Sequence, residues 1–374
     1  MKILHSTNYY PPYVGGIGEV CYYIANSLVG EVEQKVVCTN DVNKRVVEQV
    51  HGVEVNRAKS ICQIRRQQIS IDLYSLLKRT FMEFRPDILH LHMPNPLACA
   101  YILNMLPDEV KVVVHWHSDI IGQSVIYPLF KKYERKILER ADKILVTSPL
   151  YPEGSLPLQP FLNKVTLLQN IISKEKINIT EEVERDAENL KNQYGNKPII
   201  FTIGRHVPYK GLTYLIEAEK MIKSDCVILI GGNGLLTEEL KKQAEGRERI
   251  KFIGYLDDAA MLRHMCASTI FAFPSITKNE AFGIALAEAM YCGAVPVTFT
   301  IEGSGVNWVN INGETGLEVP NSDAKRYAEA VDKLLSDKDM LKTFSKNAHE
   351  RVENNFTLDI IKPKIMDIYK SVLE

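Results

Sequence analysis

The feature that most constrains the fold is an alternation of short β-branched runs with amphipathic segments. Runs typical of buried strands occur at residues 2–6, 35–39, 88–91, 111–115, 143–147 and 165–168. Helix-like segments lie between several of them, at residues 17–28, 69–84 and 126–140. This order predicts βαβ units, which form a mostly parallel, doubly wound sheet with helices on both faces.

The alternation stops once and then begins again. A polar stretch rich in Lys, Glu and Asn runs from about residue 170 to residue 197, and further strand-like runs follow at 198–203, 226–230, 250–253, 270–273 and 294–298. A chain of 374 residues is long enough for two domains. We therefore predict an α/β protein with two Rossmann-like units, divided near residue 170. The tail from residue 323 has a helical pattern, with breaks expected near Asp337, Asn354 and Pro363.

Composition excludes several classes of protein. The 45 Lys and Arg against 46 Asp and Glu give a net charge of -1, which argues against a protein that coats nucleic acid. Seven scattered cysteines without a C-x-x-C pair indicate core thiols in a reducing compartment, so a cytoplasmic location is expected. Residues 281–301 are apolar enough to suggest a membrane span, but Gly293 and Pro296 favour a buried helix followed by a buried strand.

Loops that follow strands are where ligands bind in open α/β sheets. The first strand leads to a turn with Gly15 and Gly16 before a helix, where backbone amides can approach an anion; a plain tight turn is the alternative. The strand at 198–203 leads to Gly204, Arg205 and Lys210. Two cations on one such loop predict a clamp for a diphosphate, and two solvated surface cations are the alternative.

Two glutamates follow the strand at 270–273. Glu280 comes just before a predicted helix and Glu288 lies within it, about 9 Å further along the axis. The amides of Phe282, Gly283 and Ile284 would point out of the helix start, where they could hold phosphate. Glu288 is surrounded by apolar residues, so its carboxylate needs a committed partner, either a protein donor or ligand hydroxyls.

Histidine pairs end two strands of the first half. The sequences His90-Leu91-His92 and His115-Trp116-His117 place their histidines on one face of a strand, and Asp119 follows. Such a set could bind zinc, but hydrogen-bonded core histidines are the favoured interpretation. His117 and Asp119 are the better candidates for contacts to substrate hydroxyls.

These motifs together resemble the retaining glycosyltransferases of family four, the glycosyl transferases group 1. Glu280 and Glu288, separated by seven residues and followed by Ala-Met and Gly-Ala-Val-Pro-Val, are the most specific part. Matching pieces span nearly the whole chain in order: Tyr10-Pro11-Pro12, Gly15-Gly16, Gly204-Arg205, Lys210-Gly211, the two glutamates and the segment 312–320.

The resemblance implies the GT-B fold, in which two Rossmann-like domains face a cleft. Residues 1–170 would form the acceptor-side domain, residues 171–355 the donor domain, and the helix at 356–374 would return to the first domain. Arg205 and Lys210 would hold the donor diphosphate, with help from Gly16 and the amides of 282–284. Glu288 would bind the ribose hydroxyls, Glu280 the transferred sugar, and His117 the sugar near the reacting carbon. Arg205, Lys210, His117 and Glu280 are then the catalytic candidates, and Asp119 is the candidate for acceptor binding or for a base.

The implied function is transfer of a hexose-type sugar from a UDP- or GDP-linked donor to a glycan or lipid-linked acceptor. The resemblance further implies retention of anomeric configuration, no metal and no cofactor, and a role in cell-surface polysaccharide, lipopolysaccharide or glycolipid synthesis. Asp119 or His117 as a base for inversion stays open. The alternative functions are a sugar-nucleotide epimerase of the same fold and a metal-dependent hydrolase that uses the histidine pairs.

The segment 56–85 carries seven basic residues against two acidic ones. Beside its apolar residues, this charge favours contact with an anionic membrane surface that bears a lipid-linked acceptor, on the inner face of the cytoplasmic membrane. A solvated helix face is the alternative. Oligomeric state does not follow from the sequence, and no nucleic-acid partner is expected.

Overall fold

The computed structural model describes residues 1–13, 16–64, 67–120 and 127–374. The chain forms two compact units. Unit 1 comprises Met1–Ile171 and Leu358–Glu374, and unit 2 comprises Ile172–Thr357. The chain enters unit 2 at Ile172 and leaves it after Thr357. These two ends of unit 2 lie side by side, because the Ile172 amide donates to the Phe356 carbonyl at 2.7 Å.

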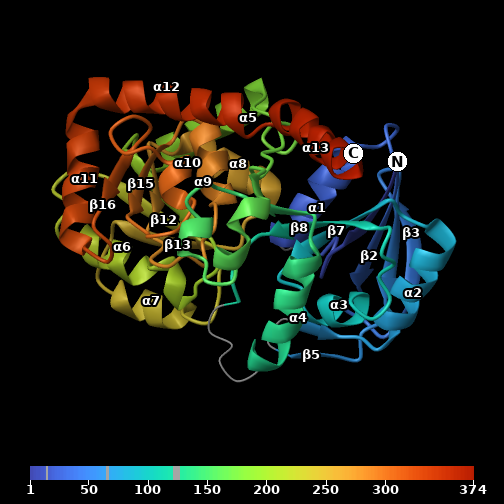
Figure 1. The fold of residues 1–374 in the computed structure, drawn as a ribbon. Coiled ribbons are helices and arrows are strands. Elements are labelled where there is room, and N and C mark those ends of the chain that lie inside the picture. Colours follow the sequence, from blue (N-terminus) through green and yellow to red (C-terminus); the bar gives the residue numbers. More distant parts are fainter. Residues whose placement is uncertain (14–15, 65–66, 121–126) are drawn as a thin grey trace. The chain divides into compact units, whose positions relative to one another are not determined.

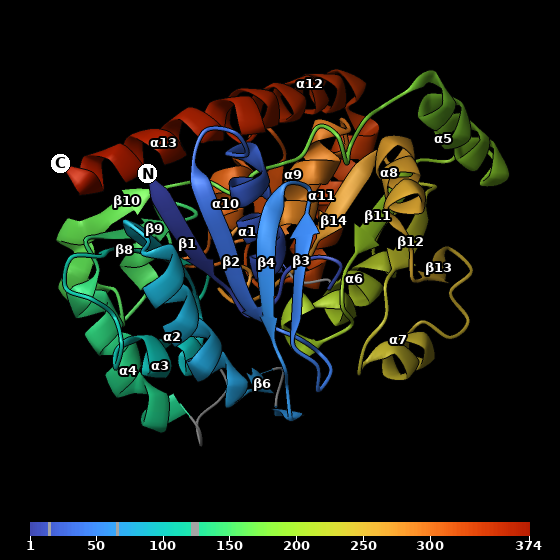
Figure 2. The same ribbon diagram turned by 90° about the vertical axis from the view of Figure 1, so that its right-hand side faces the viewer.

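Unit 1 contains an eight-stranded sheet in the order β10-β9-β8-β7-β1-β2-β4-β3. Neighbouring strands are parallel except β3 and β4, which are antiparallel. Figure 2 shows β1, β2, β4 and β3 side by side. The strands are β1 (Lys2–Ser6), β2 (Glu33–Thr39), β3 (Val46–Val50), β4 (Val53–Ala58), β7 (Ile88–Met93), β8 (Lys111–Trp116), β9 (Lys143–Val146) and β10 (Val165–Leu167).

Helices cover both faces of this sheet. On β2, Val36 and Cys38 pack with Cys21 of α1 (Gly16–Ser27), whereas Lys35 lies over the Phe84 ring of α2 (Asp72–Phe84). Residues at alternating positions of one strand thus face different helices, as the pleat of a β-strand requires. The helix α13 (Leu358–Leu373) lies against α1, and Figure 1 shows this red helix beside the blue one. The remaining elements are α3 (Pro96–Ile102), α4 (Tyr127–Arg140) and the short ribbon β5 (Cys62–Ile64) and β6 (Gln67–Ile69).

Unit 2 contains a six-stranded parallel sheet in the order β13-β12-β11-β14-β15-β16. Ile200 of β11 belongs to the core on one face, and its neighbours Ile199 and Phe201 belong to the core on the other. The strands are β11 (Ile199–Ile203), β12 (Val227–Gly231), β13 (Ile250–Gly254), β14 (Ile270–Phe273), β15 (Val295–Phe299) and β16 (Leu317–Val319).

Most helices of unit 2 pack against one of these two cores, and α12 contributes residues to both. The first core is covered by α6 (Leu212–Glu219), α7 (Thr237–Gln243) and α11 (Ala324–Ser336). The second is covered by α5 (Glu181–Gln193), α8 (Asp258–Ala267), α9 (Ile284–Tyr291), α10 (Val306–Val309) and α12 (Lys338–Asn355). The doubly wound α/β class is therefore confirmed for both units.

The apolar stretch 281–301 forms α9 and then β15, both buried, as predicted. Among the residues that the structure describes, no helix is long and apolar enough to cross a membrane.

Three sequence-based expectations differ from the structure. The polar stretch after residue 170 contains α5, whose start is capped by the Thr180 hydroxyl, which accepts from the Val183 amide. Three glutamates in the first turn favour the positive end of the helix dipole. Pro363 lies inside α13 instead of breaking it, because the buried face with Ile361, Ile365 and Tyr369 holds the helix together. Arg57 of the basic segment is buried at 2% exposure, so it adds no charge to a surface patch; Arg65 and Arg66 lie outside the described residues.

Candidate active site

The carboxyl ends of β11 and β14 bring two of the predicted loops together. These strands are neighbours, so the loop after β11 lies beside the loop after β14, and the Ile276 amide donates to the Tyr209 carbonyl at 2.9 Å. A small pocket at this edge is lined by Gly204, Arg205, Lys210, Phe273, Pro274 and Ser275. Unit 2 therefore places the predicted cations at one binding edge of the sheet.

Lys210 is held in place from three sides. It lies at the end of a short 3₁₀ turn, Pro208–Lys210, and its ammonium group forms an ion pair with Glu280. The Ser275 hydroxyl donates to the same carboxylate at 3.3 Å, and the ammonium nitrogen lies 5.1 Å from the centroid of the Phe273 ring. Both charged side chains are about 15% exposed. The pair joins the two loops and orients both charges before a ligand binds.

Arg205 differs from Lys210 in its exposure. The guanidinium is exposed and donates to the Tyr209 hydroxyl at 3.0 Å. It therefore has freedom to adjust to a ligand, whereas Lys210 is fixed.

Close backbone contacts support this loop pair. Gly211 has φ +61°, and a Cβ there would lie 2.0 Å from the Pro274 carbonyl oxygen. Gly232, after β12, has φ +95°, and its Cβ would lie 2.0 Å from the Gly204 carbonyl oxygen. Sequence reasoning missed Gly232, although a Gly-Gly-Asn-Gly run at a strand end was the available signal.

We expect Gly211→Ala to lower the free energy of unfolding by about 2 kcal/mol or more, since it combines left-handed strain with a backbone clash. Gly195→Ala is the matched control, because Gly195 has φ +67° and nothing lies within 4 Å of its Cβ position; it should cost about 1 kcal/mol. Urea unfolding of both variants, followed by the fluorescence of Trp308 in a Trp116→Phe background, measures the difference. Equal losses of unfolding free energy in the two variants would show that the close contact with Pro274 adds nothing to the cost of the substitution.

The start of α9 is built around Gly283, which has φ +88° as the residue before the helix. The first amides of the helix have no acceptor within it. Phe282 is buried against Phe356, with ring centroids 5.2 Å apart. The buried Ser304 hydroxyl donates to the Glu280 carbonyl, and the Gly305 amide donates to the Ala281 carbonyl at 3.0 Å. The segment just before α9 is thus held by the loop after β15 and by Phe356.

Glu288 has the committed partner that its apolar setting requires. It is 5% exposed, and its Oε1 lies 3.2 Å from the Lys176 ammonium nitrogen. Lys176 also lies 3.9 Å from Asp258. The need for a partner is evident from the sequence, but Lys176 is 112 positions away, and only the fold identifies it.

In unit 1, Gly16 is the first residue of α1, while Gly15 lies outside the described residues. The loop before them is held by Arg57, which donates to the Tyr10 carbonyl at 2.9 Å and also to the Pro11 carbonyl. Glu48 of β3 balances its charge at 2.6 Å. Arg57 was missed as a support for this turn.

Replacing Arg57 by methionine should lower the free energy of unfolding of unit 1 by about 2 kcal/mol, because two carbonyls lose charge-assisted bonds. Arg79→Met is the matched control; this side chain is 45% exposed and pairs with Glu83 on the same helix, so its loss should stay within about 0.5 kcal/mol. Trp116 fluorescence in a Trp308→Phe background reports on unit 1. Similar losses in both variants would contradict the supporting role.

His117 and Asp119 follow β8. His117 is buried, its Nε2 lies 3.0 Å from Nδ1 of His92, and burial lowers its pKa to about 3. It is therefore neutral at physiological pH. One carboxylate oxygen of Asp119 accepts hydrogen bonds from the Trp116 indole at 3.0 Å and the Ser155 hydroxyl at 2.6 Å. These contacts commit Asp119 to holding its loop.

Comparison with known proteins identifies the class. The family "Glycosyl transferases group 1" matches residues 184–351, and "Glycosyltransferase Family 4" matches residues 14–150. The chain thus matches the group 1 glycosyltransferases over most of unit 2 and glycosyltransferase family 4 over most of unit 1. It is an enzyme of the hexosyltransferase type with the GT-B fold, so the resemblance seen in the sequence is confirmed.

Individual relatives span the whole chain. It is 27% identical over 382 residues to O-antigen chain mannosyltransferase C of Escherichia coli, covering 100% of this chain and 99% of that one. It is 28% identical over 363 residues to D-rhamnosyltransferase WbpZ of Pseudomonas aeruginosa, covering 96% and 92%. The structure of Anabaena Alr3699/HepE in complex with UDP matches with a TM-score of 0.80 at 19% identity, over 99% of this chain and 100% of that one, which shows the shared fold.

Proposed function

We propose that the enzyme transfers a hexose-type sugar from a UDP- or GDP-linked donor to a glycan or lipid-linked acceptor in cell-surface polysaccharide synthesis. The observation that carries the proposal is the fixed Lys210–Glu280 pair beside Arg205 at the ends of β11 and β14. The similarity to an O-antigen chain mannosyltransferase and to a D-rhamnosyltransferase supports the polysaccharide role.

Breaking the bond between sugar and diphosphate develops negative charge on the leaving oxygen. Cations fixed in advance stabilise that charge without reorganisation during the reaction. An ammonium group has three donors, so Lys210 can remain bonded to Glu280 while it donates to a phosphate oxygen. Arg205 can bind two phosphate oxygens at once. In this proposal the two side chains supply the positive charge, and the reaction needs no metal.

The other candidate residues take roles around this centre. Glu280 would accept hydrogen bonds from hydroxyls of the transferred sugar, and Glu288 would accept them from the ribose. The amides of Phe282, Gly283 and Ile284 would donate to phosphate at the start of α9, where the helix dipole favours an anion. Gly16 would bring the first amides of α1 to the diphosphate in the same way.

We propose that the reaction retains the anomeric configuration. A base for inversion must be available to take the proton of the acceptor. His117 lies against His92, and Asp119 accepts hydrogen bonds from Trp116 and Ser155. Both candidate bases for inversion thus already interact with neighbouring side chains. The acceptor would instead attack from the face that the diphosphate leaves, and a donor phosphate oxygen would take its proton.

A donor screen followed by product analysis tests the proposal. Thermal shift with UDP and GDP identifies the nucleotide, and the corresponding sugar donors are then tried with glycan and lipid-linked acceptors. We expect nucleoside diphosphate to be released only when acceptor is present, which separates transfer from epimerisation. The anomeric proton of the product, observed by NMR, should show the donor's configuration. The opposite configuration would overturn retention, and release without any acceptor would overturn transfer.

A further inference from the structure

Five histidines lie on one face of the unit 1 sheet: His5, His90, His92, His115 and His117. The register pairs His5 with His90 and His92 with His115, and the two-residue spacing on β7 and β8 keeps all of them on the side covered by α1 and α13. Four of them are completely buried. Only His117 is among the candidate site residues, so the other four require a separate explanation.

Several of these imidazole nitrogens are unpaired within the described part of the chain. His90 Nδ1 lies 2.6 Å from the Tyr369 hydroxyl, and His92 Nδ1 contacts His117. Both nitrogens of His5 and of His115, and Nε2 of His90 and of His92, have no hydrogen-bond partner among the described residues. Leaving buried polar atoms unpaired is unfavourable, so this arrangement indicates a binding partner for them.

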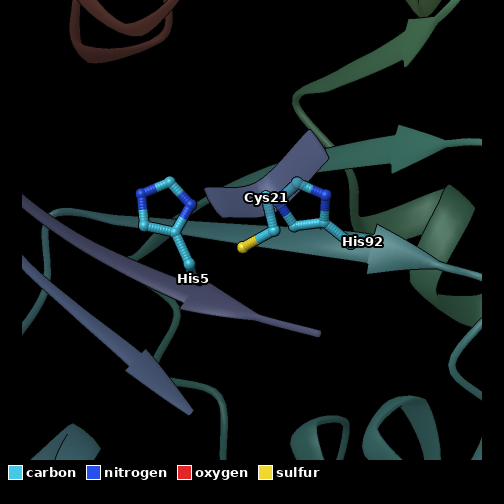
Figure 3. Close-up of side chains that lie close together, drawn as sticks. All are labelled: His5, Cys21 and His92. Atoms are coloured by element: carbon cyan, nitrogen blue, oxygen red, sulfur yellow. The ribbon is translucent and has the colours of Figure 1, made fainter. Parts of the chain in front are cut away.

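Cys21 of α1 lies where such a partner would be bound. Its sulfur and the nearest nitrogens of His5 and His92 all lie within 4.8 Å of one another, and all three residues are completely buried. Figure 3 shows the Cys21 sulfur between the two rings. Two imidazoles and a thiolate are a ligand set that zinc accepts.

Ring orientation distinguishes this group from His90, His92 and His115, whose ligand atoms are equally close. A metal ion binds in the plane of an imidazole ring, and the His90 ring is stacked on both of its partners, at 25° and 8°. The His5 and His92 rings are tilted by 37° with centroids 6.1 Å apart, whereas the centroids of the two stacked pairs lie 4.4 and 5.4 Å apart. Ligand atoms of a tetrahedral zinc site lie about 3.3–3.6 Å apart, so the three side chains must rotate to close the site.

We propose that His5, Cys21 and His92 bind a zinc-type divalent cation in the core of unit 1. As the metal–sulfur bond forms, the Cys21 thiol releases its proton to solvent. For His92, a second contact of the kind that orients a metal-bound histidine is present, because its Nδ1 lies 3.0 Å from Nε2 of His117. For His5, the Gln34 side chain lies beside the ring, and its Oε1 has no hydrogen-bond partner among the described residues.

This site would also fix the proton on the candidate catalytic histidine. If the metal occupies Nε2 of His92, the proton of that ring must be on Nδ1, which then donates to Nε2 of His117. His117 consequently keeps its own proton on Nδ1. The importance of this proton rests on the expected contact of His117 with the transferred sugar, whereas the metal site itself does not.

Because all three ligands are buried, the ion must enter as the chain folds. We would unfold the full-length protein in guanidinium with a non-chelating reductant and refold it with Co²⁺. We expect about one cobalt per chain, a near-ultraviolet thiolate-to-cobalt charge-transfer band, and displacement of the cobalt by Zn²⁺.

Cys21→Ser should abolish the charge-transfer band, and His5→Gln should weaken cobalt binding at least about tenfold. Cys99→Ser is the matched control, because Cys99 is a buried thiol of the same unit that contacts Met93; it should retain the band. Wild-type protein that refolds without cobalt or without the band would overturn the proposal, whether or not the variants fold. Retention of the band in Cys21→Ser, or its loss in Cys99→Ser, would also overturn it.

Discussion

Lys210→Ala is expected to lower kcat/KM by about 10²- to 10³-fold while the fold remains intact. The ammonium group is fixed by Glu280 and by the Phe273 ring before the donor binds, so its stabilisation of the leaving diphosphate costs no reorganisation. Loss of one such preorganised donor typically removes about 3 kcal/mol of transition-state stabilisation. Steady-state release of nucleoside diphosphate, with the donor found by the screen, measures the change.

Lys241→Ala is the matched control for Lys210. Lys241 pairs with Glu238 at 2.9 Å, but it is 50% exposed and lies on α7. Its removal should change kcat/KM less than about twofold. Thermal unfolding of both variants checks that the fold is retained. Wild-type kcat/KM in a folded Lys210→Ala variant would overturn the proposed role of Lys210 in stabilising the leaving diphosphate.

Glu288→Ala is expected to have two effects of different origin. It leaves Lys176, which is 18% exposed, without its close carboxylate, so the free energy of unfolding of unit 2 should fall by about 2–3 kcal/mol. It should also weaken nucleoside diphosphate binding, because the ribose loses its proposed acceptor. Urea unfolding measures the first effect, and calorimetric titration with the nucleotide measures the second.

The double variant Glu288→Leu with Lys176→Met separates these effects. Replacing both charges by apolar groups of similar volume should restore most of the stability. Nucleotide binding should remain weak, because no carboxylate is present to accept the ribose hydroxyls. If the double variant binds nucleotide as tightly as wild type, Glu288 is a structural partner of Lys176 and has no part in donor binding.

Local patterns predicted much of the secondary structure. β1 and β14 have the predicted bounds, and most other predicted strands differ by one or two residues, because buried parallel strands are continuous apolar runs. The strands β3, β4, β5, β6 and β16 were not predicted, and among them β3 is an antiparallel edge strand. Only every second residue of β3 is partly buried, so β3 lacks the continuous apolar run of the other strands. Its clearest signal in the sequence is Gly52 in the turn that follows it.

For the candidate site, the sequence determined which loops carry the charges. Gly204, Arg205, Lys210, Glu280 and Glu288 could be named because each stands at a fixed offset from a strand or a helix start, and such offsets depend on local geometry.

Only the tertiary structure decided the partners: Lys210 with Glu280, Glu288 with Lys176, and Arg57 with the Tyr10 turn. It also brought Cys21 close to His5 and His92. The physical reason is that hydrophobic periodicity and secondary-structure propensity act over a few residues, whereas the energy of an ion pair or hydrogen bond depends on the distance between its partners and on their burial. These are set when strands distant in sequence become neighbours in a sheet. Arg57 illustrates this: its charge indicated a surface, and the fold buried it where two carbonyls and Glu48 compensate the charge.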